Sequence, residues 1–327
     1  MKTYFDFTLT GKKFLPVWIL FIVLLIVPYG FLLFEIKDMQ PGEVPEMSFF
    51  LLPVAMFFVA FILTFYMARL LIEGIAYNDK SIVFNGTFGE YMVKVLLGFF
   101  LSIITLGIYI PWFTKDITGF FVDNSSYDSA SLKFKGAGSK LFAIITLTII
   151  IPMVIFFIIL LTSLYTQTNR VIVPPATIIM QLIIMILMIP STYLTYKWIV
   201  NVDYKNFNIR WKTNFWNSCW KVTGQVLLSI VTIGVYYPMA IVRLYKYFVD
   251  RTVAISDDRK RSFGYDIEAS KDFLFLWGQI LLIIITFGIY YPWALCKIGK
   301  RILSKTYVTD THGNNANEGT ETQSTYN

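Results

Sequence analysis

The stretch Ile104-Thr105-Leu106-Gly107-Ile108-Tyr109-Ile110-Pro111-Trp112 closes an apolar run. Its pattern, Thr-x-Gly-x-Tyr-x-Pro, recurs after two further apolar runs, as Thr232-Ile233-Gly234-Val235-Tyr236-Tyr237-Pro238 and Thr286-Phe287-Gly288-Ile289-Tyr290-Tyr291-Pro292. The glycine weakens a membrane helix, and the proline four residues later removes a backbone donor and clashes with the preceding turn. A threonine hydroxyl can bond the carbonyls that such a break frees, and the aromatic residues suit an interfacial depth. The motif therefore predicts three programmed helix breaks.

The residues that define the predicted breaks are Thr105, Gly107, Tyr109, Pro111, Trp112, Thr232, Gly234, Tyr236, Pro238, Thr286, Gly288, Tyr290, Pro292 and Trp293. A basic residue follows each proline by four or five positions: Lys115, Arg243 and Lys297. These side chains are candidates for contacts with lipid headgroups, or for an anion-attracting ring around a pathway.

Composition indicates an integral membrane protein. Of 327 residues, 56% are hydrophobic and only 15% are charged, against about a quarter charged in soluble proteins. Four segments without a charged residue have about the 20-residue length that crosses a hydrocarbon core. They are Phe14 to Phe34, Phe49 to Ala68, Leu141 to Tyr165 and Ala176 to Tyr196. We therefore predict a mainly α, polytopic membrane protein with four full spans.

Charge distribution chooses between two topologies. If every motif helix crosses, there are seven spans, and the 28 Lys and Arg residues divide evenly between the two sides. If the chain turns back at each motif, only Lys37 and Arg170 lie outside. Because cytoplasmic loops carry the excess of basic residues, we favour re-entrant or half-inserted motif helices with both termini in the cytoplasm. Seven spans remain the alternative.

Short polar segments with period-2 alternation predict amphipathic strands on the cytoplasmic side. They lie near 5–11, 80–86, 132–136 and 206–212, with a hairpin between 253 and 264. The spacing from Thr105 to Thr232 and from Tyr77 to Tyr204 is 127 residues. This predicts a tandem duplication of a unit of about 126 residues, followed by a half unit. The expected divisions are 1–125, 126–252 and 253–308, with a disordered polar tail at 309–327, all in one membrane body.

The same residues resemble the YjgN-like family of bacterial inner-membrane proteins, a domain of unknown function. The resemblance rests on the triple motif, on Gly89-Glu90-Tyr91, and on the Phe-x-Gly strand ends at Phe84 and Phe134. Two departures affect the middle copy, where Met239 replaces tryptophan and Trp211-Lys212-Thr213 replaces Phe-x-Gly. The resemblance implies a location in the bacterial cytoplasmic membrane, with several passes, and it brings no catalytic residues.

The motifs leave two function classes open. Broken helices can line a solute or ion site, as in transporters, which favours a transporter-like or channel-like conduit. The alternative is a non-transporting membrane protein whose strand-rich face binds lipid headgroups or a protein partner. We expect no enzyme, cofactor, metal or nucleic-acid site, because no catalytic, phosphate-binding or metal-ligand pattern is present in the sequence. The expected partners are membrane lipids and a small solute or ion.

Overall fold

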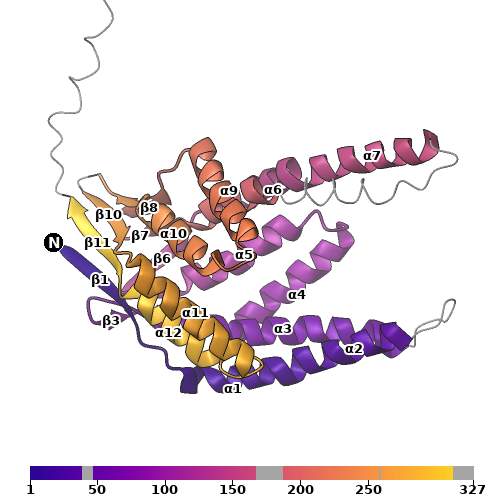
Figure 1. Ribbon diagram of the computed structural model, residues 1–327, viewed down its shortest axis with the longest axis horizontal. Helices are drawn as coiled ribbons and strands as arrows, with labels where there is room; N and C mark the ends of the chain where they lie inside the picture. The colour runs from indigo at the N-terminus through magenta and orange to yellow at the C-terminus, as the bar shows by residue number, and fades with distance from the viewer. Residues whose placement is uncertain (39–46, 167–186, 258, 312–327) are drawn as a thin grey trace, which may run out of the picture.

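A computed structural model describes residues 1–38, 47–166, 187–257 and 259–311. Helices gather on one side of a single antiparallel sheet (Figure 1). The strands are β1 (Lys2–Phe7), β2 (Ile75–Tyr77), β3 (Lys80–Ser81), β4 (Val83–Phe84), β5 (Ser125–Tyr127), β6 (Ala130–Phe134), β7 (Asn201–Tyr204), β8 (Phe207–Trp211), β9 (Thr252–Ile255), β10 (Lys260–Tyr265) and β11 (Thr306–Thr311).

The sheet curls into a nearly closed barrel. Its order is β3-β2-β1-β11-β10-β9-β8-β7-β6-β5-β4. The two strands at the ends of this order, β3 and β4, are separated only by Ile82, so one stretch of chain pairs with β2 on one side and β5 on the other. The first and last strands also meet, with Lys2 opposite Thr309. Closure of this kind leaves few unpaired strand edges.

One rim of the barrel consists of tight turns, and we call it the turn rim. Three hairpins turn through two residues each. Positive φ angles at both residues of the first two turns, Asn78–Asp79 and Asp128–Ser129, fit the type I′ geometry that matches strand twist, while the third turn has a positive φ at Lys205. A tyrosine precedes each turn. The Tyr127 hydroxyl donates to the Tyr77 carbonyl (2.9 Å), and the Tyr204 hydroxyl donates to the Tyr127 carbonyl (3.0 Å). These bonds tie neighbouring hairpins together around the rim.

Five helical excursions leave from the opposite rim, which we call the helix rim. The first comprises α1 (Gly11–Phe21), η1 (Ile22–Ile26), α2 (Val27–Asp38) and α3 (Met47–Glu73). The second comprises α4 (Phe88–Ile104) and α5 (Ile110–Asp123). The third comprises α6 (Gly138–Ile145), η2 (Thr146–Ile150), α7 (Ile151–Thr166) and a returning helix over 187–199. The fourth comprises α9 (Phe215–Val231) and α10 (Tyr237–Val249), and the fifth α11 (Ala269–Ile285) and α12 (Tyr291–Leu303).

All five excursions begin in the same register. The fourth residue after each N-cap is buried against the helix rim: Phe14, Tyr91, Leu141, Ser218 and Asp272. Each excursion then packs on the next. The contacts run from α3 to α4, α5 to α6, α10 to α11 and α12 back to α1. The third reaches the fourth through Tyr193, whose hydroxyl lies 2.7 Å from the Thr213 hydroxyl. The excursions therefore form a ring above the barrel.

The fold differs from the predicted four-span helical protein. Among the described residues, three helices are long and apolar enough to cross a membrane: Gly11–Lys37, Phe49–Glu73 and Gly138–Ile158. The fourth predicted span, Ala176 to Tyr196, lies largely outside the described residues. Strands lie at or near each predicted segment, although β1 covers Lys2–Phe7 instead of 5–11 and α1 already begins at Gly11. They belong to one 11-stranded sheet rather than to separate hairpins. Local alternation indicates a strand but cannot show that β1 pairs with β11 some 300 residues later. β11 also extends to Thr311, past the predicted start of the tail.

Candidate functional site: three helical hairpin turns

Each motif forms the turn of a helical hairpin. In the first copy α4 ends at the C-cap Thr105, and α5 begins after the N-cap Tyr109 with a proline in its first turn. The other two copies repeat this arrangement, and the two helices of each hairpin pack on each other. The chain therefore reverses direction at the motif. The seven-span alternative required one continuous crossing helix at each motif, and the hairpins do not fit it.

The threonine closes the turn from both sides. The Thr105 hydroxyl donates to the Leu101 carbonyl (2.7 Å) and accepts from the Tyr109 backbone N–H (3.0 Å). Thr232 and Thr286 make the same pair of bonds at 2.7–3.1 Å. One hydroxyl thus gives the N-cap amide of the second helix an acceptor, which is one of the groups that a helix start leaves free. In the first copy it is also a second donor to the Leu101 carbonyl, which already accepts from the Thr105 backbone N–H (3.0 Å).

Two successive residues at each turn adopt the left-handed conformation. The glycines have φ of +88°, +81° and +85°, which glycine adopts without steric cost. The preceding residues, Leu106, Ile233 and Phe287, have φ of 50°, 51° and 49°. For a bulky or β-branched residue this conformation is strained by about 1–3 kcal/mol. The chain keeps a large apolar side chain at each turn in spite of this strain.

Replacing the turn glycine should therefore destabilise a hairpin. Gly234→Ala places a Cβ in the left-handed region, and we expect a loss of about 1–2 kcal/mol in the free energy of unfolding. Gly224→Ala in α9 of the same hairpin is the matched control. A Cβ there meets nothing within 4 Å, and helical Gly→Ala is normally stabilising. Thermal unfolding of both variants in detergent checks this, and an equal response of the two would contradict it.

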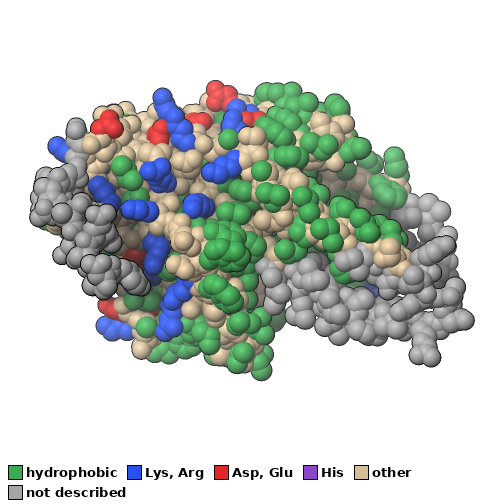
Figure 2. All heavy atoms as spheres, turned by 90° about the horizontal axis from the view of Figure 1, so that it is seen from above, with side chains coloured by type: hydrophobic (Ala, Val, Ile, Leu, Met, Phe, Trp, Pro, Cys, Tyr) green, Lys and Arg blue, Asp and Glu red, His purple; other side chains and the backbone are tan. Residues whose placement is uncertain are grey.

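The side chains at the turns point into open space. Leu106, Ile233 and Phe287 are 94%, 93% and 95% exposed. Their apolar neighbours two positions away on either side, such as Ile104 and Ile108, are exposed as well. Each hairpin thus ends in an uncovered apolar tip. Figure 2 shows hydrophobic side chains over the helical part of the molecule, while Lys and Arg gather towards the strands.

The motif tyrosines reach polar groups inside their hairpins. The Tyr236 hydroxyl donates to the Gln225 carboxamide oxygen (2.9 Å), and the Tyr290 hydroxyl to that of Gln279 (3.2 Å). In the first hairpin Gly98 stands at the glutamine position, and its ideal Cβ would clash with the Phe113 ring at 1.9 Å. There the Tyr109 hydroxyl donates to Asp116 instead (3.3 Å). The two glutamines were not recognised from sequence, although each lies seven residues before the motif threonine.

The three predicted basic residues do not occupy one structural position. Arg243 and Lys297 both lie seven residues after the motif tyrosine, with Arg243 over the Tyr236 ring and the Lys297 ammonium 2.8 Å from the Tyr290 hydroxyl. In the first hairpin this place belongs to Asp116, to which Lys115 is paired at 3.1 Å. The three charges lie on three separate hairpins, nine or ten residues after Leu106, Ile233 and Phe287.

Prolines and tryptophans connect the hairpins to their neighbours. Pro111, Pro238 and Pro292 are buried in the first turns of α5, α10 and α12. Trp112 packs on Gly138 and Trp293 packs on Gly11, where an added Cβ would come within 2.6 Å of each indole. Met239, which follows the proline of the second motif where the other two motifs have tryptophan, is buried in α10.

Two tryptophans outside the motifs, for which no sequence pattern predicts a role, donate hydrogen bonds to the turns from neighbouring excursions. The Trp18 indole N–H of α1 donates to the Gly288 carbonyl (3.0 Å), and that of Trp277 in α11 donates to the Val235 carbonyl (2.9 Å). The Val235 carbonyl thereby has a donor on the adjacent excursion. The Gly288 carbonyl, which also accepts from the Tyr291 backbone N–H (3.1 Å), has a second donor there.

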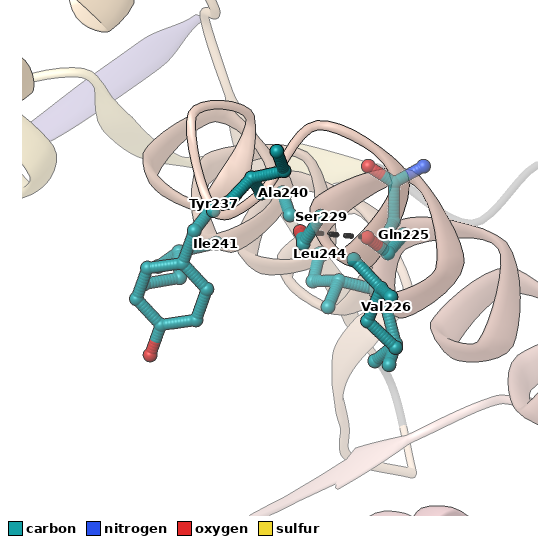
Figure 3. A pocket seen from close by; sticks show the side chains of 10 residues that line it. Gln225, Val226, Ser229, Tyr237, Ala240, Ile241 and Leu244 are labelled. Carbon is teal, nitrogen blue, oxygen red and sulfur yellow. Dashed lines mark hydrogen bonds between the residues drawn. The ribbon is translucent and has the colours of Figure 1, made fainter.

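A groove of about 420 Å³ runs beside the second turn, between α9 and α10 (Figure 3). Its wall is mainly aliphatic, including Val226, Ile230 and Leu244, with Gln225 and Ser229 as polar members. The Ser229 hydroxyl donates a hydrogen bond to the Gln225 backbone carbonyl (2.9 Å). At the position of Ala240 in this groove the first hairpin has the large ring of Phe113.

The base of the fifth excursion holds a buried ion cluster. Asp272 is 1% exposed and accepts hydrogen bonds from Arg301 (3.0 Å), from Lys305 (2.6 Å) and from the Glu268 backbone N–H (2.9 Å). In the fourth excursion the equivalent pair is Ser218 and Tyr247, whose hydroxyls lie 3.3 Å apart. Within the described ranges no group of three His, Cys, Asp or Glu side chains is placed to hold a metal.

Comparison with known proteins gives two matches. The family described as "Bacterial protein of unknown function (DUF898)" matches residues 2–264. The inner membrane protein YjgN of Salmonella typhimurium is 34% identical over 77 residues, which is 24% of this chain and 20% of that protein. The aligned part thus spans about one fifth of the length of this curated relative. No solved structure matches the chain significantly.

Proposed function

Because this chain belongs to the DUF898 family, bacterial proteins of unknown function that include YjgN-like inner membrane proteins, we propose that it is an inner-membrane protein that embeds three hairpins in one leaflet. The long helices of the first and third excursions cross the bilayer. The second, fourth and fifth enter only the leaflet next to the barrel and turn back. The protein in this proposal is a lipid-binding membrane protein rather than a conduit.

The spacing of charges around each tip carries the proposal. Lys94 lies twelve residues before Leu106, and Lys115 lies nine residues after it. At 1.5 Å per residue these legs are about 18 and 14 Å long. Half of a hydrocarbon core is about 15 Å. Each leg therefore reaches from the headgroups to the middle of the bilayer, and neither leg is long enough to cross it.

The fourth excursion has legs of matching length, and α12 of the fifth also matches. Lys221 lies twelve residues before Ile233 and Arg243 ten residues after it, so the legs are about 18 and 15 Å long. Lys297 lies ten residues after Phe287. On α11 the nearest charged residue, Asp272, lies fifteen residues before Phe287, about 22 Å at 1.5 Å per residue. On α9, Trp216 and Trp220 are exposed beside Lys221. Exposed tryptophans at this level suit the membrane–water interface.

The exposed tips favour the same function. In water, each tip would combine an uncovered apolar side chain with a strained backbone. In a leaflet the exposure becomes favourable, at roughly 25 cal/mol per Å² of apolar surface removed from water, and this offsets the strain at Leu106, Ile233 and Phe287.

The conduit hypothesis has less support. Transporters with broken helices use freed backbone groups to bind solutes. Here the N-cap amides at the turns donate to the threonine hydroxyls, and the Val235 and Gly288 carbonyls accept from indoles. The groove beside the second turn has a mainly aliphatic wall. Lys115, Arg243 and Lys297 fit headgroup contacts at the level where the legs leave the hydrocarbon.

A depth measurement tests the proposal. Single cysteines at Leu106, Ile233 or Phe287, in a Cys219→Ser/Cys296→Ala background, would carry a fluorescent label in reconstituted vesicles. Lipids brominated deep in the acyl chain should quench all three labels, whereas aqueous iodide should not. Labels at Lys205 and Lys260, both exposed at the turn rim, should show the reverse. Quenching of the tip labels by iodide would refute leaflet insertion.

A further inference from the structure

We infer that this protein is a tapered membrane inclusion that favours bilayers curved convexly towards the barrel side. The inference rests on the proposed insertion of the hairpins in one leaflet. It adds an activity, namely a response to curvature and a tendency to generate it, and it follows from how the helices divide between the two leaflets.

The taper arises because excursions of two lengths share one ring. In the leaflet next to the barrel, all five excursions contribute helices. Beyond the hairpin tips only the first and third continue, through α1–α3 and through α6, η2 and α7. Figure 1 shows these two long arms extending past the shorter hairpins. The protein is therefore broad in one leaflet and narrow in the other.

The difference in area is large on the scale of lipids. An α-helix with its side chains is about 10–12 Å across, hence about 80–110 Å² in section. The six motif helices α4, α5, α9, α10, α11 and α12 add about 500–650 Å² to one leaflet by this estimate. Crossing helices occupy both leaflets and do not contribute to this difference.

The hairpins are held firmly enough to act as a wedge. Trp112 is packed on Gly138 and Trp293 on Gly11, so the second and fifth excursions are each locked against a crossing helix. The Trp18 and Trp277 indoles fasten the fifth and fourth turns to their neighbours. At the base, the five buried entry residues fix each excursion to the barrel. A bilayer adapts to such a rigid inclusion by expanding the leaflet on the barrel side.

The position of the hairpins around the ring strengthens the effect. Hairpins occupy the second, fourth and fifth places, with crossing excursions in the first and third. The extra area therefore lies around the ring instead of on one flank. This produces a cone, and a cone bends the surrounding membrane in every direction.

Tubes drawn from giant vesicles test the inference with the full-length protein. A dye attached at Lys205→Cys reports the orientation of each molecule. An impermeant quencher abolishes the fluorescence of molecules whose barrel faces outward and leaves that of the others. The density of the outward-facing molecules on the tube, divided by that on the flat vesicle, should exceed one and rise as the tube narrows. Molecules with the barrel inward serve as an internal control, and their ratio should fall below one.

Equal ratios for the two orientations would overturn the taper inference. The depth labels could still show inserted hairpins in that case, so the proposed function would stand. If the labels show no insertion, the proposed function itself fails. The comparison of orientations needs no destabilising variant. A second measurement, the mean diameter of vesicles formed by detergent removal, should decrease as the ratio of protein to lipid rises, and no change would count against the inference.

Discussion

The Leu106→Asp/Ile233→Asp/Phe287→Asp variant should no longer insert its hairpins. Aspartate at the centre of a bilayer costs about 2.5–3.5 kcal/mol by insertion scales, so three substitutions cost about 8–10 kcal/mol. A label at Ile104, which is also exposed at the first tip, should change from deep-lipid quenching to quenching by aqueous iodide.

A matched control places the same charges on the opposite rim. Asn78, Ser129 and Asn206 are exposed in the three two-residue turns, and aspartate tolerates tight turns well. Their replacement by aspartate adds three negative charges without touching the tips. This variant should keep the Ile104 label deep. An unchanged label depth in the tip variant would show that the hairpins do not depend on their apolar tips for their position.

The Asp272→Ala variant should be strongly destabilised. The carboxylate is buried against Arg301 and Lys305, with Glu268 also bound to both basic groups. Removing one member of a buried ion pair typically costs about 3–5 kcal/mol. In this variant Arg301 and Lys305 would keep only the exposed Glu268 as an acidic partner in the described part of the chain. Thermal unfolding in detergent should show a large fall in the midpoint. Asp266→Asn, which removes an exposed partner of Lys2, should produce a much smaller change.

A double substitution separates charge balance from packing. Asp272→Ser with Arg301→Tyr reproduces the Ser218 and Tyr247 pair of the preceding excursion. This variant should recover part of the stability that Asp272→Ala loses. If it unfolds as readily as Asp272→Ala, the ion cluster has a requirement that the hydroxyl pair does not meet.

The same cluster predicts a dependence on pH. Burial alone would raise the pKa of Asp272, but hydrogen bonds from Lys305, from the Glu268 backbone N–H and from Arg301 outweigh it and hold the pKa below its usual value. A carboxyl with a depressed folded-state pKa stabilises the fold above its unfolded-state pKa. That contribution is lost as pH falls through the folded-state value. Wild-type protein should therefore lose more stability in acid than the Asp272→Ser/Arg301→Tyr variant.

The sequence by itself determined the local events. Three Thr-x-Gly-x-Tyr-x-Pro motifs located three helix breaks within a residue or two, because glycine, proline and a capping threonine act on their immediate neighbours. The alternating segments located several strands, including β6, β8, β9 and β10, and the motif residues carried the YjgN-like resemblance that the family match confirms. The tandem duplication and the anion ring remain untested predictions.

Only the tertiary structure decided what those local pieces build. The barrel depends on pairings such as β1 with β11, which no local pattern records. Trp18 and Gln225 gained roles from partners on other helices or across a turn, and the buried Asp272 cluster joins residues about 30 positions apart. The tips show most clearly what the tertiary structure added to the sequence. In the sequence they are ordinary apolar residues. The reversal of the chain leaves Leu106, Ile233 and Phe287 uncovered at three separate hairpin ends, and this makes them a surface suited to a leaflet.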